Sequence, residues 1–145
     1  MRVDGILFDK DGTLFDFRTT WNAWAAKLIR DLAEGQAETA QAIANNLIFD
    51  LNTNTFDPRS PVIAGSNREV AELIGAVLTD RPIEALEAHL TQAAAVAPLA
   101  PAVPLAPFLS EMRAIGLRLG VMTNDTEFGA KAHLSAAGVD HLFDF

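Results

Sequence analysis

The sequence contains no cysteine, and its basic residues are outnumbered by acidic ones. Without cysteine the chain has no disulfide framework and no thiol chemistry, which favours a reducing compartment. Only 11 Lys and Arg residues stand against 19 Asp and Glu residues, giving a formal net charge of −8. That balance argues against nucleic acid, whose phosphates bind basic patches, and weakly against an anionic membrane surface.

Long hydrophobic runs are absent as well. No segment approaches the length of a transmembrane helix. The apolar stretch near the N-terminus is too short for a signal peptide and is interrupted by acids. We therefore expect a cytoplasmic enzyme or binding domain of 145 residues, half of them hydrophobic, with no nucleic-acid partner and no membrane partner.

The clearest chemical signal follows the apolar run 6–8. There the chain reads Asp9-Lys10-Asp11-Gly12-Thr13-Leu14. We expect a short strand over 3–9. Its second half is apolar without alternation, which predicts that both of its faces are covered. The strand ends in a tight loop that carries the two carboxylates.

Helical spacing, caps and breakers predict the remaining elements. We expect helices over 20–32, 38–51, 66–78, 82–95, 107–115 and 127–137, a strand over 117–122, and the lead-in to a third strand over 139–145. Residues 52–66 read as irregular, and the four helices before residue 97 contain no convincing strand. Asp16 is expected to help start the first of these helices.

Strands separated by helices imply a parallel sheet, so the predicted fold class is α/β. The predicted architecture is a Rossmann-like core with an α-helical cap inserted after the first strand. Core residues are 1–16 and 104–145, the cap is 17–97, and a proline-rich linker covers 98–103.

Ligands of open parallel sheets bind beyond the carboxyl ends of the strands. Asp9 ends the first predicted strand, and Thr123, Asn124 and Asp125 end the second. A carboxylate at Asp9 is suited to attack phosphorus, and one at Asp11 to protonate the leaving oxygen and then activate water. Mg²⁺ would offset the repulsion between the carboxylates and a phosphate.

Each of these motifs also has a simpler interpretation. A lone pair of acids two residues apart is usually solvated loop, and Thr-Asn-Asp commonly forms a turn or a helix cap. A calcium loop of the EF-hand kind is excluded, because Gly12 falls at the fourth position rather than the sixth. The preceding apolar strands favour a phosphoryl-binding site.

The two motifs resemble the first and second signatures of the haloacid dehalogenase superfamily, and the helical insert is similar to the cap of phosphoglycolate-phosphatase-like members. The resemblance implies that Asp9 is the nucleophile and Asp11 the acid/base. It also implies phosphate binding by Thr123, with Asn124 and the loop at Gly12 beside it. Mg²⁺ would be held by Asp9 and by Asp11 through its backbone carbonyl.

Position 11 discriminates within that superfamily, because the dehalogenases lack an acid there and the cation-pumping ATPases have Thr. Asp11 therefore favours a phosphatase or phosphomutase. The family's third motif, a lysine, and its fourth, a pair of acids, usually lie beyond the third strand. We therefore expect the chain to be a fragment, or a truncated version, of a longer protein. Lys131 reads as a solvated helix residue, and Asp140 and Asp144 are not assigned to the metal.

Weaker signals leave alternatives open. Trp21 and Trp24 read as packing inside the cap, with Trp21 closing over a substrate as the alternative. Arg59 reads as a surface residue, with a substrate carboxylate as its other possible partner. The three histidines, which lack metal-ligand spacing, read as surface or edge residues: His89, His133 and His141.

The resulting hypothesis is a Mg²⁺-dependent phosphatase of a small phosphorylated metabolite, acting through an aspartyl-phosphate, with phosphoglycolate as the first candidate by resemblance. One alternative is a phosphomutase of the β-phosphoglucomutase kind. Another is a non-catalytic remnant that binds phosphate or a partner protein. The choice between a monomer and a homodimer stays open.

Overall fold

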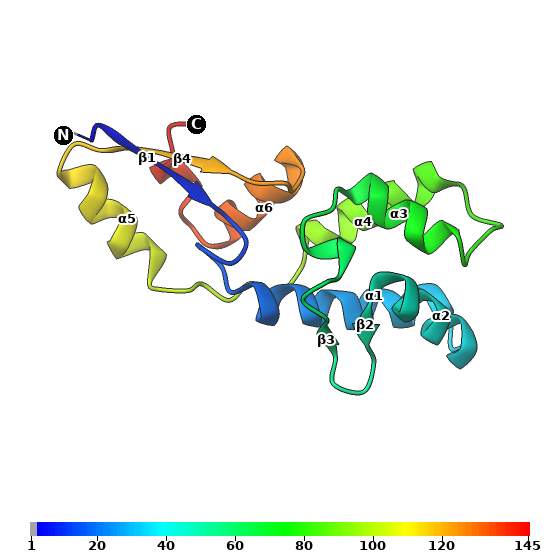
Figure 1. Ribbon diagram of the computed structural model, residues 1–145. Coiled ribbons are helices and arrows are strands. Elements are labelled where there is room, and N and C mark those ends of the chain that lie inside the picture. The colour runs from blue at the N-terminus through cyan, green and yellow to red at the C-terminus, as the bar shows by residue number, and fades with distance from the viewer. Residues whose placement is uncertain (1–2) are drawn as a thin grey trace.

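The computed structural model describes residues 3–145 and contains the predicted parallel pair of strands. Strand β1 (Gly5–Asp9) pairs with β4 (Arg118–Met122), with Gly5 opposite Arg118 and Asp9 opposite Met122. Both strands therefore end at the same edge of the sheet (Figure 1). The α/β class and the parallel pairing are confirmed.

Only one face of β1 is well covered, so the expectation that both faces are buried is wrong. Leu7 is 51% exposed, whereas Ile6 and Phe8 point into a cluster of buried residues. That cluster gathers side chains from helix α5 (Leu105–Ala114), β4 and helix α6 (Glu127–Ala136); it comprises Leu14, Phe15, Leu105, Leu109, Leu119, Leu134 and Val139. Apolar composition alone could not distinguish the two faces, because all three residues of the run are apolar.

A tight loop connects β1 to the first cap helix. Gly12 has φ +92°, a left-handed conformation that a side chain would strain. Asp16 Oδ1 accepts a hydrogen bond from the Thr19 backbone N–H at 2.7 Å, as expected of a residue that starts a helix. A π-helical turn, Arg18–Asn22, then runs directly into α1 (Ala23–Ala33).

Two further cap helices follow the predictions closely at their starts. Helix α3 (Asn67–Gly75) begins with the predicted capping box, in which Ser66 and Glu69 satisfy each other's backbone N–H groups. Helix α4 (Ile83–Ala95) begins after Pro82. With α1 and α2 (Ala37–Leu47) they bury a second cluster of apolar residues, from Trp24 to Ala97 along the chain.

The end of α2 differs from the prediction. The helix stops at Leu47 rather than at residue 51, because Ile48 turns left-handed at φ +50°. A short antiparallel hairpin follows, formed by β2 (Phe49–Asp50) and β3 (Thr55–Phe56), so the expectation of no strand in the cap is wrong. The rings of Phe49 and Phe56 pack edge to face with centroids 4.9 Å apart, which stabilises this hairpin.

The proline-rich segment returns beside the outgoing chain. The backbone N–H of Asp16 donates to the Ala100 carbonyl, and that of Ala102 donates to the Leu14 carbonyl. In Figure 1 the chain passes from α4 along this segment to α5, while α1 to α4 lie together away from the sheet. The boundaries 1–16, 17–97 and 104–145 remain a proposal for how the two parts divide.

The last residues lie against β4. A 3₁₀ turn, Asp140–Leu142, precedes two backbone hydrogen bonds, from Asp144 N–H to the Leu119 carbonyl and from Val121 N–H to the Phe145 carbonyl. Residues 139–145 thus reach the edge of β4 without forming a regular strand. No helix in the described range 3–145 is long and apolar enough to cross a membrane.

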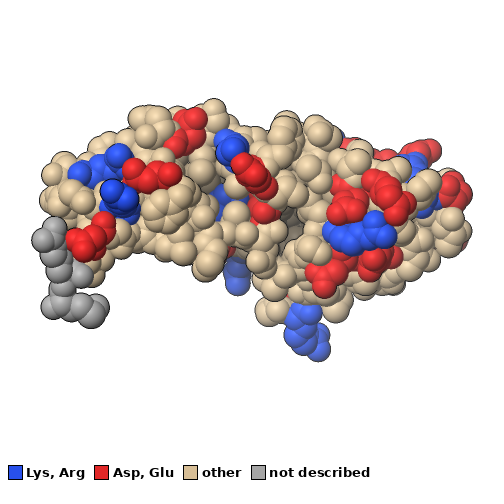
Figure 2. Space-filling view, turned by 90° about the horizontal axis from the view of Figure 1, so that it is seen from above, with Lys and Arg blue, Asp and Glu red and all other residues tan. Residues whose placement is uncertain are grey.

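Charged side chains of both signs are interspersed on the face shown in Figure 2. Over the cap, Arg68 pairs with three acids on α3 and α4: Glu72, Glu84 and Glu87. Blue side chains on this face neighbour red ones, and no continuous basic patch is visible there. The absence of a nucleic-acid partner remains a prediction from net charge.

Candidate active site

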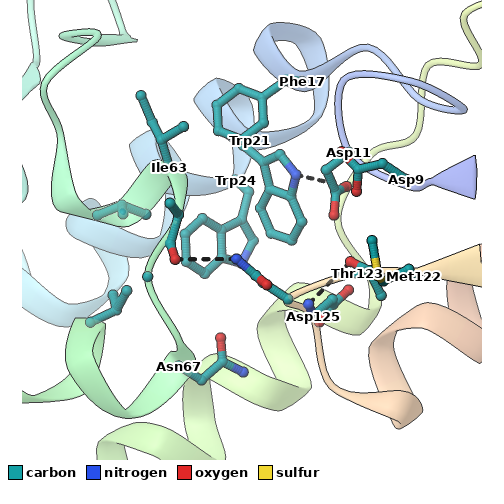
Figure 3. A pocket seen from close by; sticks show the side chains of 15 residues that line it. Asp9, Asp11, Phe17, Trp21, Trp24, Ile63, Asn67, Met122, Thr123 and Asp125 are labelled. Atoms are coloured by element: carbon teal, nitrogen blue, oxygen red, sulfur yellow. Dashed lines mark hydrogen bonds between the residues drawn. The ribbon is translucent and has the colours of Figure 1, made fainter.

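The carboxyl ends of β1 and β4 open into a pocket between the sheet and the cap, with a volume of about 490 Å³ (Figure 3). Asp9, Asp11, Thr123 and Asn124 all line it. Gly12 does not, although its left-handed turn shapes the loop that carries Asp11. The parallel register brings the two motifs together, because Asp9 lies opposite Met122. The chemical roles of these residues stay predictions.

Asp9 is the exposed carboxylate of the site. Its Oδ1 accepts a hydrogen bond from the backbone N–H of Lys10 at 2.8 Å. This contact orients the carboxylate while leaving it open to the pocket. An exposed, oriented carboxylate at a strand end is suited either to attack an electrophile or to bind a hard cation.

Asp11 is held from two sides. The ammonium of Lys10 lies 2.8 Å from Asp11 Oδ2, and the indole N–H of Trp21 donates to Asp11 Oδ1 at 2.9 Å (Figure 3). Trp21 therefore lines the pocket and contacts Asp11, besides packing edge to face on Trp24 with ring centroids 5.2 Å apart. The packing of Trp21 on Trp24 agrees with the expected packing inside the cap, whereas closure of Trp21 over a substrate stays a prediction.

Lys10 is the centre of a buried polar cluster that the sequence analysis missed. Its side chain is fully buried, with Nζ at 2.8 Å from Asp11, 3.1 Å from Asp125 Oδ2 and 3.0 Å from His133 Nδ1. The side chain of Asp125 is itself only 5% exposed, and its Oδ2 has no well-aligned hydrogen bond among the described residues. The ion pair with Lys10 is what compensates this buried charge.

His133 is buried as well, so its prediction as a surface or edge residue is wrong. Its Nε2 lies 2.7 Å from the Ala94 carbonyl of α4, which can only accept, so Nε2 carries the proton. Nδ1 then accepts from the Lys10 ammonium. Burial, followed by the charge of Lys10, holds the pKa of His133 below its ordinary value of 6.5, which agrees with a neutral ring.

This neutral histidine predicts a pH-dependent stability. Because its folded pKa lies below the unfolded value of 6.5, the unfolded chain binds more protons as the pH falls through 6.5, and stability decreases. The slope from one proton is at most about 1.4 kcal/mol per pH unit. We expect His133→Gln, which keeps a donor and an acceptor, to remove this slope in urea unfolding between about pH 7.5 and about pH 5.5.

The matched control is His141→Gln, since His141 is exposed on the 3₁₀ turn. This variant removes an exposed imidazole and leaves the buried cluster intact, so the decrease in stability expected from His133 should remain. The carboxylates whose pKa is lowered, such as Asp16 and Glu69, titrate below this window from ordinary values of 3.8 and 4.5. An unchanged slope in His133→Gln would contradict the assignment.

The loop after β4 connects the second motif to α6 and to the cap. Thr123 Oγ1 accepts from the backbone N–H of Asp125 at 3.1 Å, and Thr126 caps α6 by accepting from Gly129 N–H at 3.0 Å. Asn124 Nδ2 donates to the Ala64 carbonyl of the cap at 3.2 Å (Figure 3). That hydrogen bond uses one of the two N–H donors of the Asn124 amide, so the other is available to a ligand at this edge.

Gly129 allows Asp125 to approach α6 closely. A Cβ at this position would lie 2.6 Å from Asp125 Oδ1, closer than real Cβ contacts allow. The glycine thus lets the carboxylate sit beside the first turn of the helix, where the helix dipole favours negative charge.

The donor chemistry of the site fits Mg²⁺ through few protein ligands. No group of three or more His, Cys, Asp or Glu side chains placed to hold a metal occurs within residues 3–145. Mg²⁺ commonly uses only one or two carboxylates together with water and substrate phosphate. The exposed carboxylate of Asp9 meets that requirement, and the side chain of Asp11 is engaged by Lys10 and Trp21.

Other residues considered from the sequence lie away from this pocket. Lys131 pairs with Glu127 on the solvent side of α6. The side chain of Arg59 is 83% exposed. Its guanidinium donates two hydrogen bonds to Asp57 and its backbone N–H donates a third, and these bonds lower the pKa of that carboxyl to about 2. Asp144 pairs with Arg113. None of these side chains is among the described residues that line the pocket.

Comparison with known proteins identifies the family. The family model of the haloacid dehalogenase-like hydrolases matches residues 3–145. No curated protein matches the chain. The fold is similar to that of L-2-haloacid dehalogenase from Xanthobacter autotrophicus with chloropropionic acid covalently bound, with a TM-score of 0.52 and 20% identity over 99% of this chain.

A second structure of that Xanthobacter enzyme gives a TM-score of 0.51, also at 20% identity. At this identity the likeness shows the fold alone. The chain spans 55% of the length of both of these structures. Because the family model covers nearly all of the sequence, this chain belongs to the haloacid dehalogenase-like hydrolases.

Proposed function

We propose that this hydrolase is a Mg²⁺-dependent phosphatase that cleaves small phosphomonoesters through an aspartyl-phosphate. The observation that supports it most is the pairing of an exposed carboxylate, Asp9, with a second carboxylate, Asp11, that two neighbours fix at the same pocket. A dehalogenase needs no acid beside its nucleophile, because a halide leaves without a proton. A phosphomonoesterase does, because an alkoxide leaves slowly unless it is protonated.

The proposed reaction has two displacements. The carboxylate of Asp9 attacks phosphorus, the bond to the ester oxygen breaks, and the carboxyl group of Asp11 transfers a proton to the leaving alkoxide. Asp11 then takes a proton from water as that water attacks the phosphoaspartate. Phosphate leaves, and both carboxyl groups return to their starting forms.

The second motif, Thr123 and Asn124, would bind the transferred phosphoryl group. The hydroxyl of Thr123 and the amide of Asn124 line the same pocket as Asp9 and can donate to phosphoryl oxygens. Mg²⁺, held by the Asp9 carboxylate and the Asp11 backbone carbonyl, would supply positive charge that offsets the phosphate. Lys10 would keep Asp11 in place, since its ammonium contacts that carboxylate from the buried side.

The second candidate is a 2-haloacid dehalogenase, which the fold of the Xanthobacter enzyme favours. In that reaction Asp9 would attack carbon and expel halide, and water would cleave the resulting ester. Asp11 would have no proton to donate. The two candidates therefore share the nucleophile and differ in their dependence on Asp11 and on Mg²⁺.

Asp11→Asn separates the two candidates. We expect the variant to lose about 10²- to 10⁴-fold in phosphate release, because general acid and base catalysis is removed while the amide still accepts from Trp21. Phosphate released from phosphomonoesters and chloride released from 2-chloropropionate are measured in parallel, with and without EDTA. Unimpaired phosphate release by Asp11→Asn, or chloride release that is insensitive to both EDTA and this substitution, would contradict the phosphatase proposal.

A further inference from the structure

The cap-side wall of the pocket is mostly apolar and aromatic. Its side chains include Phe17, Trp21, Trp24, Val62 and Ile63, together with the amide of Asn67, while Met122 lines the strand side beside Thr123 (Figure 3). The indoles of Trp21 and Trp24 stand nearly perpendicular, at 85°, so together they form a rigid aromatic corner. Trp21 is fixed further by its hydrogen bond to Asp11.

The charges at the pocket are all of one sign. Its acidic side chains are Asp9, Asp11 and Asp125, and no Lys, Arg or His occurs among the described residues that line it. The nearest lysine, Lys10, is fully buried and engaged by Asp11, Asp125 and His133. Arg59, the residue considered for a substrate carboxylate, points to solvent and pairs with Asp57.

Within residues 3–145, a second anionic group on the substrate would meet the three carboxylates, apolar side chains and the amide of Asn67, but no cationic side chain. An unpaired charge moved from water into such surroundings is strongly disfavoured. An uncharged aromatic group would instead exchange water for contact with Trp21, Trp24 and Ile63. The pocket volume of about 490 Å³ lies in the range of ~300–1,000 Å³ usual for ligand pockets and leaves room for such a group beside the phosphoryl site.

We propose that the substrate's organic portion is an uncharged aryl or arylalkyl group that binds in the Trp21–Trp24 corner, and not a second acid such as that of phosphoglycolate. This inference rests on the proposed phosphatase function for its chemical step. The selectivity of the wall does not depend on that step and is measured separately by binding.

The kinetic test compares benzyl phosphate with 2-phosphoglycolate. Both esters release an alkyl alcohol, so a difference in kcat/KM reflects binding of the organic group in the pocket more than the chemistry of the leaving group. We expect kcat/KM for benzyl phosphate to be at least tenfold higher at equal Mg²⁺. Equal or higher kcat/KM for phosphoglycolate would overturn the substrate class and leave the phosphatase function standing.

A variant pair tests the wall directly. Ile63 lies on a short 3₁₀ turn and is 41% exposed, so Ile63→Arg can place a cation at the wall with little effect on the core. It should lower kcat/KM for benzyl phosphate and raise it for phosphoglycolate. The control is Ile115→Arg, because Ile115 is 77% exposed at the end of α5 and does not line the pocket. A similar change in both variants would contradict the role of the wall.

The binding test does not require turnover. The sequence has only two tryptophans, and both line the pocket, so ligand binding is expected to change their fluorescence. Benzylphosphonate, which has no ester bond, should bind to the protein, and an excess of phosphoglycolate should not displace it. If no ester is hydrolysed but this selectivity is seen, the phosphatase function fails and the pocket assignment holds. If phosphoglycolate binds and benzylphosphonate does not, the assignment is wrong.

Discussion

Asp9→Asn should reduce phosphate release by on the order of 10⁴-fold or more, because the variant keeps the shape of the side chain but lacks the nucleophile. Asp9 is exposed, with one described hydrogen bond from the Lys10 backbone, and the amide of Asn can keep that acceptor. Folding should therefore be unaffected. Initial rates of phosphate release, with circular dichroism to verify the fold, measure the effect.

The matched control for this substitution is Asp80→Asn. Asp80 is also exposed, but it lies between α3 and α4 and does not line the pocket. Its variant should release phosphate at the rate of the unmodified protein. Full activity in Asp9→Asn would eliminate Asp9 as the nucleophile, and with it both the phosphatase and the dehalogenase mechanisms described above.

Lys10→Met should destabilise the fold by about 3–5 kcal/mol, because removing one partner of a buried ion pair leaves the other charge uncompensated. Asp125 is 5% exposed, and Lys10 is its buried cationic partner at 3.1 Å. His133 would also lose the donor to its Nδ1. The free energy of unfolding in urea measures the loss.

Two further variants test whether the loss of stability comes from the buried ion pair. Lys131→Met removes an equal charge from an exposed pair with Glu127 on α6, and it should change stability little. The double variant Lys10→Met, Asp125→Asn should be less destabilised than the sum of the two single variants, since the second substitution removes the stranded charge. Additive effects would contradict direct coupling between Lys10 and Asp125.

Local patterns in the sequence predicted most of the elements that support the site. The apolar run before Asp9 marked a strand, and Ser66 with Glu69 marked the start of α3. The hairpin β2–β3 was missed because strands of two residues are too short for an alternating pattern. Its formation depends instead on the left-handed turn at Ile48 and the contact between two phenylalanines.

The residues of the site were likewise predicted only in part. Asp9, Asp11, Thr123 and Asn124 were predicted to lie near each other because parallel strands end at one edge, and the pocket contains all four. The cluster around Lys10 was not predicted. Lys10 and His133 are 123 positions apart, and the acceptor that orients His133 is the backbone of Ala94, which no side-chain pattern reveals. A lysine close behind an apolar strand was the one local signal.

The measurement that tests the central proposal most directly is the identification of the covalent intermediate. The protein is mixed with benzyl phosphate and Mg²⁺, quenched in acid and digested, and the peptides are analysed by mass spectrometry. The proposed mechanism predicts the mass of one added phosphoryl group on the peptide containing Asp9, and none in Asp9→Asn. A phosphoryl group on another residue, or an organic adduct on Asp9 formed from 2-chloropropionate without any phosphoryl adduct, would contradict it.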